Sequence, residues 1–138
     1  MRRTLSLKHF LKGLVISMLD FAKLLQSELS TITKECFHEK NRKDKVVYPY
    51  LTYDYDRENI TRERDEITIE IDIFDFNTSY KRVLELEEQI KRHFNGMMQL
   101  TEELYVNFRF VGSNKVNTGS DTVKRRNIRL SVQTEWRN

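Results

Sequence analysis

Acidic side chains crowd the middle of this 138-residue sequence and could supply the ligands of a divalent metal ion. Glu70 and Asp72 stand two residues apart in an alternating segment, so a strand would place both carboxylates on one face of a sheet. Carboxylates of this kind could hold the metal of a nuclease, but no lysine follows at the spacing that such an enzyme would use and no histidine is near. We therefore favour a solvent-exposed sheet face with acidic turns and keep a metal-dependent enzyme as the less favoured alternative. The carboxylates considered as possible ligands are those of Asp54, Asp56, Glu58, Asp65, Glu66, Glu70, Asp72 and Asp75.

The other residue types that commonly take part in catalysis are isolated from one another. The histidines His9, His38 and His93 fall in different segments without ligand spacing, and Cys36 has no base partner in the sequence. No glycine-rich phosphate loop and no Gly-x-Ser-x-Gly motif occurs. A single cysteine excludes an internal disulfide and a cysteine-based zinc site, and its simplest setting is a reducing cytoplasm. The sequence therefore predicts a protein that is not an enzyme and has neither a metal nor a cofactor.

A basic segment near the C-terminus offers a different chemistry. Lys124, Arg125 and Arg126 are consecutive, and further arginines and Trp136 follow them. A strip of this kind can bind phosphates, so a small nucleic-acid-binding module is the alternative function that the sequence leaves open. Basic residues on a solvent-facing strand are also common, and the pattern alone does not separate the two interpretations.

Four tyrosines within eight residues form the most unusual cluster. On a strand, Tyr48 and Tyr50 would share one face, and Tyr53 and Tyr55 the other. Amphipathic aromatic side chains on an edge strand favour protein–protein contact. Cross-strand packing within the monomer is the alternative.

The charges are distributed unevenly along the chain. Residues 1–45 carry ten Lys/Arg and five Asp/Glu, whereas residues 46–76 carry three and nine. Residues 112–138 carry six basic and two acidic residues, so an acidic middle lies between basic ends although the whole chain has a net charge of only +3. This arrangement would suit head-to-tail self-association. Neutralisation within the monomer is an equally good interpretation.

The N-terminal region resembles a targeting signal without having its features. Lys12 and Asp20 interrupt an apolar run from Phe10 to Phe21, and no small-residue cleavage site follows. The run is too short to span a bilayer. We therefore expect a buried amphipathic helix and no membrane association.

Hydrophobic periodicity predicts a single α+β domain over residues 1–138 in the order α-β-β-α-β-β. Ile67, Ile69, Ile71 and Ile73 alternate with polar residues and predict a strand with one buried face. Pro49 cannot donate to a ladder, which favours an edge position for the strand that contains it. We expect a mostly four-stranded antiparallel sheet with a long N-terminal helix and a second helix on one face. The expected segments are helices 4–36 and 80–95, strands 46–55, 66–76, 104–111 and 128–136, and a mobile loop at about 112–124.

One pair of segments carries a family resemblance. The sequence Tyr48-Pro49-Tyr50-Leu51-Thr52-Tyr53, a charged turn, and then the run from Ile67 to Asp75 resemble the tail terminator proteins of long-tailed bacteriophages and prophages, which are also called tail completion or head–tail joining proteins. In that family a strand of the form Pro-Tyr-hydrophobic-Thr-Tyr leads into a strand of the form hydrophobic-x-Val/Ile-Asp-Ile/Val-Trp/Phe, and a helix follows. The resemblance covers about 47–94, and the remainder agrees in topology only.

The resemblance implies a non-enzymatic structural protein made in the cytoplasm of a bacterial host and placed at the head–tail interface of a virion. Its partners would be other copies of itself in a hexameric ring, the tail tube protein, and the head connector or stopper protein, with DNA passing non-specifically through the ring. The ring would stop polymerisation of the tail tube. No residue has a chemical role across the family, so the predicted interface comes from the residues themselves. It comprises Tyr48, Tyr50, Tyr53, Tyr55, Glu70, Asp72, Lys124, Arg125 and Arg126.

Overall fold

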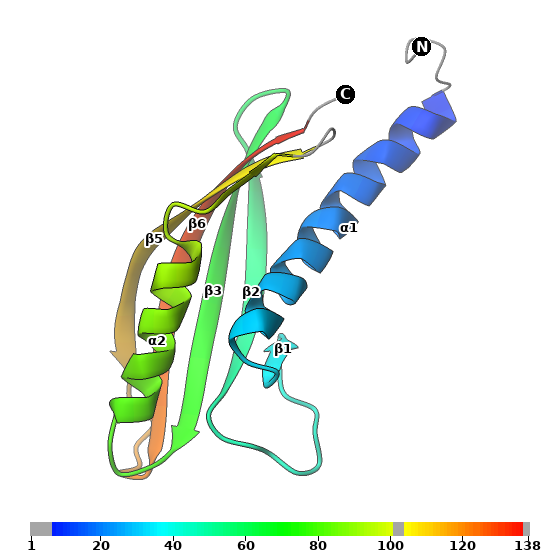
Figure 1. Cartoon of the computed structure of the whole chain (residues 1–138). Coiled ribbons are helices and arrows are strands. Elements are labelled where there is room, and N and C mark those ends of the chain that lie inside the picture. The colour runs from blue at the N-terminus through cyan, green and yellow to red at the C-terminus, as the bar shows by residue number, and fades with distance from the viewer. Residues whose placement is uncertain (1–6, 101–103, 137–138) are drawn as a thin grey trace.

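The computed structural model describes the backbone of residues 7–100 and 104–136 and the side chains from residue 19 onward within these ranges. Two helices and six strands follow one another along the described chain (Figure 1). The expected helix start at residue 4 and the side chains of the first part of the apolar run lie outside the described residues. The elements are α1 (Leu7–Ile32), β1 (Cys36–His38), β2 (Tyr50–Asn59), β3 (Arg64–Phe76), α2 (Lys81–Phe94), β4 (Met98–Leu100), β5 (Leu104–Val116) and β6 (Val123–Trp136).

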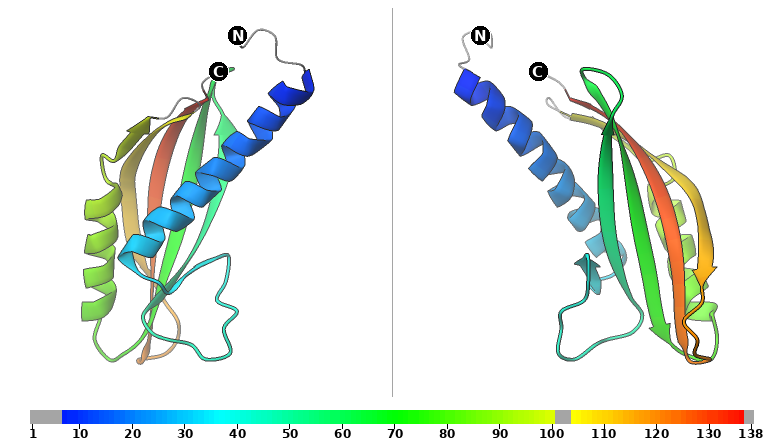
Figure 2. Two further views of the ribbon diagram at one scale, coloured as in Figure 1. Left: turned by 45° about the vertical axis from the view of Figure 1, so that its right-hand side comes forward. Right: turned by 180° about the vertical axis from the view of Figure 1, so that it is seen from behind.

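All the described strands form one curled sheet in the order β1-β2-β3-β6-β5-β4. β1 runs parallel to β2, and every other pair is antiparallel. Both helices cover the same face, and the view from behind shows the opposite face without a helix (Figure 2). The α+β class and the one-sided helices are as expected. The four-stranded antiparallel sheet is corrected to a six-stranded mixed sheet, because β1 and β4 have three residues each and are too short to give a periodic pattern.

The core lies between the sheet and the two helices. The four isoleucines of β3 are fully buried, which confirms the alternation expected from the sequence. α2 buries one apolar stripe, and the described part of α1 buries another at the spacing of a helix that packs on a sheet. The fully buried helix residues are Phe21, Leu25, Leu29, Val83, Ile90 and Phe94.

Two strand boundaries differ from the sequence prediction. β2 begins directly after Pro49, so residues 46–49 belong to the segment before the strand. The expected loop at 112–124 is shorter, because β5 continues to Val116 and β6 begins at Val123. A β-bulge between Phe110 and Gly112 shifts the register, and polar pairs such as Asn114–Asn127 then continue the ladder. The bulge and the polar pairs interrupt the apolar alternation that marks a strand in the sequence.

Tyr53 gives the fold a predicted sensitivity to alkaline pH. Its hydroxyl donates to the side-chain carbonyl of Gln26 on α1, and burial, with smaller effects of Cys36 and Tyr55, raises its pKa from 10.0 to about 12. The folded state therefore keeps this proton while the unfolded chain loses it, so stability present below pH 10 is lost as the pH rises toward 12. The shift corresponds to about 3 kcal/mol.

Urea unfolding at a series of pH values measures this loss. The Tyr53→Phe variant has no hydroxyl to ionise, so its unfolding free energy should fall less steeply above pH 10 than that of the parent protein. Equal slopes for the two proteins would show that another group controls the alkaline transition.

Candidate interaction surface on the open sheet face

The open face carries a cluster of aromatic side chains at the end where β2 begins. Tyr50 stacks on Phe74 of β3 with ring centroids 4.9 Å apart, and Tyr48 lies 5.6 Å from Tyr50 and 6.1 Å from Phe76. Tyr48 is 39% exposed and Phe76 is 58% exposed. We call these four residues the aromatic patch. Strand alternation creates the patch, because it directs Tyr50, Phe74 and Phe76 away from the buried isoleucines.

Cations border the aromatic patch on two sides. Arg125 of β6 lies over the ring of Phe74 at 5.2 Å, and Lys43 lies over the ring of Phe37 at 5.4 Å. Phe37 in turn contacts Tyr50, with centroids 6.2 Å apart. Burial raises the pKa of Tyr50, Tyr48 adds to this effect, and Arg125 opposes it. The patch is thus an apolar surface beside positive charge, and Val46 and Val47 are exposed next to it in the sequence.

The other two tyrosines of the cluster lie on the helix side of the sheet. Tyr53 is 5% exposed and belongs to the core. Tyr55 packs edge-on against Phe21 of α1, with centroids 5.8 Å apart. The structure therefore divides the tyrosines as the alternation predicted, and Tyr48 and Tyr50 are the pair on the open face.

Acidic residues occupy the other part of the open face, toward the β2–β3 turn. Asp54 pairs directly opposite Glu70, and Glu58 opposite Glu66. Like charges in directly opposite positions destabilise an antiparallel pair of strands. Among these four, only Asp54 has a described basic side chain in contact, with Oδ1 lying 3.4 Å from His38 Nε2. We call the residues that line this area the acidic strip: Asp54, Asp56, Glu58, Glu66 and Glu70.

Glu70 and Asp72 do not act together. Asp72 accepts hydrogen bonds from Arg125 Nε at 3.3 Å and from Asn127 Nδ2 at 3.2 Å, whereas Glu70 points to solvent. Within the part of the chain that the structure describes, no group of three or more potential ligands is placed to hold a metal ion. The arrangement offers exposed carboxylates rather than a coordination site.

The consecutive basic residues are separated by the sheet. Lys124 and Arg126 face α2, and Arg125 faces the opposite side. Lys124 donates to the backbone carbonyl of Asp121 at 2.5 Å, and Arg126 donates to Glu87 of α2 and, at 3.1 Å, to Ser113. All three side chains therefore have partners within the monomer and do not form one basic surface for a nucleic acid.

The remaining candidates for chemistry have structural contacts. His93 on α2 lies 2.7 Å from Glu28 on α1 and links the two helices. Cys36 is buried beside Gln26 and Ser30. The side chain of His9 lies outside the described residues.

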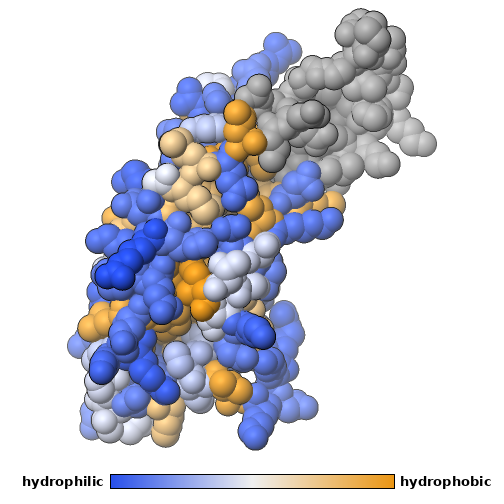
Figure 3. All heavy atoms as spheres, in the orientation of Figure 1, coloured by the Kyte–Doolittle hydropathy of each residue, from blue (hydrophilic) through white to orange (hydrophobic). Residues whose placement is uncertain are grey.

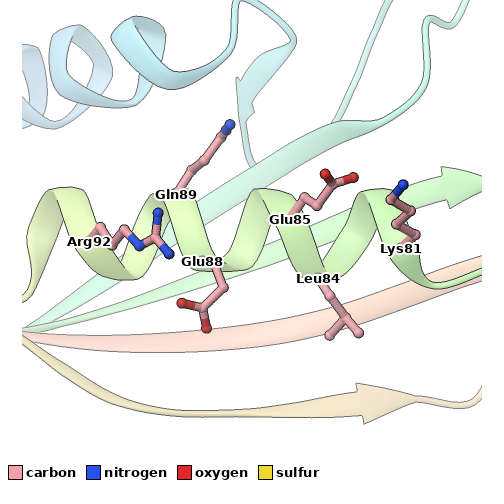
Figure 4. A pocket seen from close by; sticks show the side chains of 6 residues that line it. All are labelled: Lys81, Leu84, Glu85, Glu88, Gln89 and Arg92. Carbon is pink, nitrogen blue, oxygen red and sulfur yellow. The ribbon is translucent and has the colours of Figure 1, made fainter.

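A shallow hollow of about 490 Å³ lies along the exposed side of α2, on the helix-bearing face. All six side chains that line it come from this one helix, so no opposing wall encloses a ligand (Figure 4). The surface over α2 is largely hydrophilic, and apolar side chains are visible beside the helix (Figure 3). Small ligands prefer concave sites that bury most of their surface, which this hollow does not provide. Its lining residues are Lys81, Leu84, Glu85, Glu88, Gln89 and Arg92.

Sequence reasoning identified half of the aromatic patch. Phe74 and Phe76 lie on the polar side of the predicted strand but are not among the predicted interface residues. An aromatic residue on the polar side of an amphipathic strand was the signal that could have found them. Their neighbours across the strands then complete the surface.

Comparisons with known proteins identify a similar fold but no matching family. No family description matches the chain, and no curated protein matches its sequence. No helix among the described residues has the length and apolar character needed to cross a membrane. A chain in the solved structure "Virion of native gene transfer agent (GTA) particle" superposes with a TM-score of 0.61 at 8% sequence identity, covering 78% of this chain and 84% of that chain. The protein therefore shares its fold with a chain of that virion.

Proposed function

We propose that this protein is a non-enzymatic structural component of a phage or prophage virion. In this role it forms a hexameric ring on the end of the tail tube, stops tube polymerisation and joins the tail to the head connector. The ring would sit at the head–tail interface and let DNA pass without reading its sequence.

The observation that carries this proposal is the fold shared with a chain of a virion particle over most of both lengths. The resemblance of residues 47–94 to tail terminator proteins supports the same role from the sequence, independently of the fold. The open face adds a physical reason for assembly, because it leaves exposed aromatic side chains without a covering element. The basic segment gives the nucleic-acid alternative less support, since its three side chains bond within the monomer.

Electron microscopy of the purified protein mixed with tail tubes tests the proposal. The expected result is a ring at one end of each tube, and tubes that stop growing when the protein is added during assembly. Protein that leaves tube ends bare and tube length unchanged would contradict the tail role. Light scattering of the protein alone shows whether the ring forms in the absence of tail tubes.

Charge reversal in the acidic strip gives a prediction at residue level. Glu70→Lys places a cation between Asp54 and Arg129, its two cross-strand neighbours. The change removes the like-charge pair with Asp54 and creates a like-charge pair with Arg129, so the unfolding free energy should change by less than about 1 kcal/mol. Ring formation on tubes should nevertheless fall. Thermal unfolding measures the first effect and ring counts in micrographs measure the second; normal capping by the variant would remove the strip from the assembly contact.

A further inference from the structure

We infer that the aromatic patch of one copy binds the acidic strip of a second copy, so that the open sheet face is the surface through which this chain assembles with itself. The inference rests on the proposed ring and specifies the contact that would build it. The aromatic patch lies on the open face where β2 begins, and the acidic strip extends on the same face from the middle of β2 and β3 to the turn between them.

The aromatic patch has the composition of an interface centre. Tyr48, Tyr50, Phe74 and Phe76 contact one another and leave substantial area exposed. Tyrosine and phenylalanine bury large areas with little loss of conformational entropy, and exposed patches rimmed by polar groups mark protein contacts. The segment between β1 and β2 extends beside this end of the sheet (Figure 1).

Basic residues precede the patch in the chain. Residues 40–45 hold four Lys/Arg and one Asp, and Arg125 borders the patch from β6. Lys40, Arg42 and Lys45 are exposed and form no ion pair with another described residue. We call these three residues the basic rim. A partner that covers the patch must therefore bring negative charge to the rim.

The acidic strip supplies that charge on the same protein. The strip carries five carboxylates, and four of them form two directly opposed cross-strand pairs, Asp54–Glu70 and Glu58–Glu66. Ile60, in the turn beside it, is 50% exposed and adds an apolar residue to the acidic surroundings. Binding cations from a partner would relieve the repulsion that the folded monomer retains.

A second copy of this chain is the partner that fits both halves. Within one copy the patch and the strip are separated along the strands, because the pair Tyr50–Phe74 lies four residues from Asp54–Glu70 and eight from Glu58–Glu66. A patch-to-strip contact therefore joins two copies through different surfaces. Such heterologous contacts generate a ring when the rotation between copies closes.

Paired charge reversals test the contact on the intact protein. One variant reverses the strip (Glu66→Lys, Glu70→Lys), and the other reverses the rim (Arg42→Glu, Lys45→Glu). Each alone should weaken self-association in sedimentation by about tenfold or more, because it changes the net charge of the strip from −5 to −1 or that of the rim from +3 to −1. An equal mixture of the two should restore part of the association, because the unchanged strip of the rim variant can again meet the unchanged rim of the strip variant. The double variant Tyr48→Ser, Phe76→Ser should also weaken association, through the loss of apolar area.

The matched control is Glu85→Lys with Glu88→Lys, which makes the same charge change on the exposed side of α2 and should leave association unchanged. Parent protein that stays monomeric at low salt up to about 1 mM, both alone and on tail tubes, would overturn the inference. So would a mixture of the two reversed variants that associates no better than either alone. Parent protein that stays monomeric while tubes are bound through the patch would assign the patch to the tube protein instead.

Tube binding is scored separately in micrographs, which keeps the two ideas distinguishable. Charge-dependent rings that ignore tubes would retain the contact and reject the tail role. Capped tubes that are insensitive to all the reversals would retain the tail role and reject the contact.

Discussion

Replacing Phe108 by alanine is expected to lower the free energy of unfolding by about 3–5 kcal/mol. Phe108 lies in β5 and is 1% exposed. Its ring is 5.2 Å from that of Phe94 on α2 and stacks at 6.4 Å on that of Phe21 on α1. Loss of the ring would leave a cavity bordered by both helices and the sheet, and no single element could shift to fill it. Because small domains have only about 5–15 kcal/mol of stability, the loss is a large share of the total.

Urea unfolding followed by circular dichroism measures this effect as a lower midpoint with an unchanged slope. Phe76→Ala is the matched control, because it removes the same side chain from the exposed face and should cost less than about 1 kcal/mol. Similar losses for the two variants would contradict the placement of Phe108 at the junction of both helices. A variant that does not fold at all can be replaced by Phe108→Leu, which should show a smaller loss in the same direction.

The central strand and the second helix could be predicted because each is long and regular. Ile67 to Ile73 keep a period of two, and Val83, Leu86, Ile90 and Phe94 keep a helical period, so each buries one side without ambiguity. β1 and β4 could not be predicted in the same way. Each pairs through three residues at a sheet edge, and that pairing depends on neighbours far away in the sequence.

For the open face, the sequence predicts which side of the sheet a residue faces but not which residues lie beside it. Alternation correctly placed Glu70 and Asp72 on one side of β3, but their different surroundings follow from β6, which brings Arg125 and Asn127 to Asp72. The same alternation separates Arg125 from its sequence neighbours. The partners of buried charges are distant in sequence and become known only when the strands and helices pack.

The ion pair between Glu87 and Arg126 is the clearest of these distant partners, and breaking it should have the second large effect on stability. Arg126 Nε donates to Glu87 Oε1, and the side chains are 22% and 11% exposed respectively. Glu87→Ala would leave the guanidinium partly buried with Ser113 as its remaining described partner. We expect a loss of about 2–4 kcal/mol, somewhat below the range for fully buried pairs because water reaches part of Arg126.

A double-mutant cycle separates the pair itself from the cost of an orphaned charge. The cycle compares Glu87→Leu, Arg126→Met and the variant with both changes; the double variant should recover most of the loss of Glu87→Leu, because replacing a buried pair by apolar residues of similar size is often neutral. The cycle would therefore give a coupling energy of about 1–3 kcal/mol between the two positions. The coupling should change little with salt, since partly buried pairs are weakly screened. Additive losses in the double variant would mean that Arg126 has no energetic dependence on Glu87, and that α2 is held on the sheet by its apolar stripe alone.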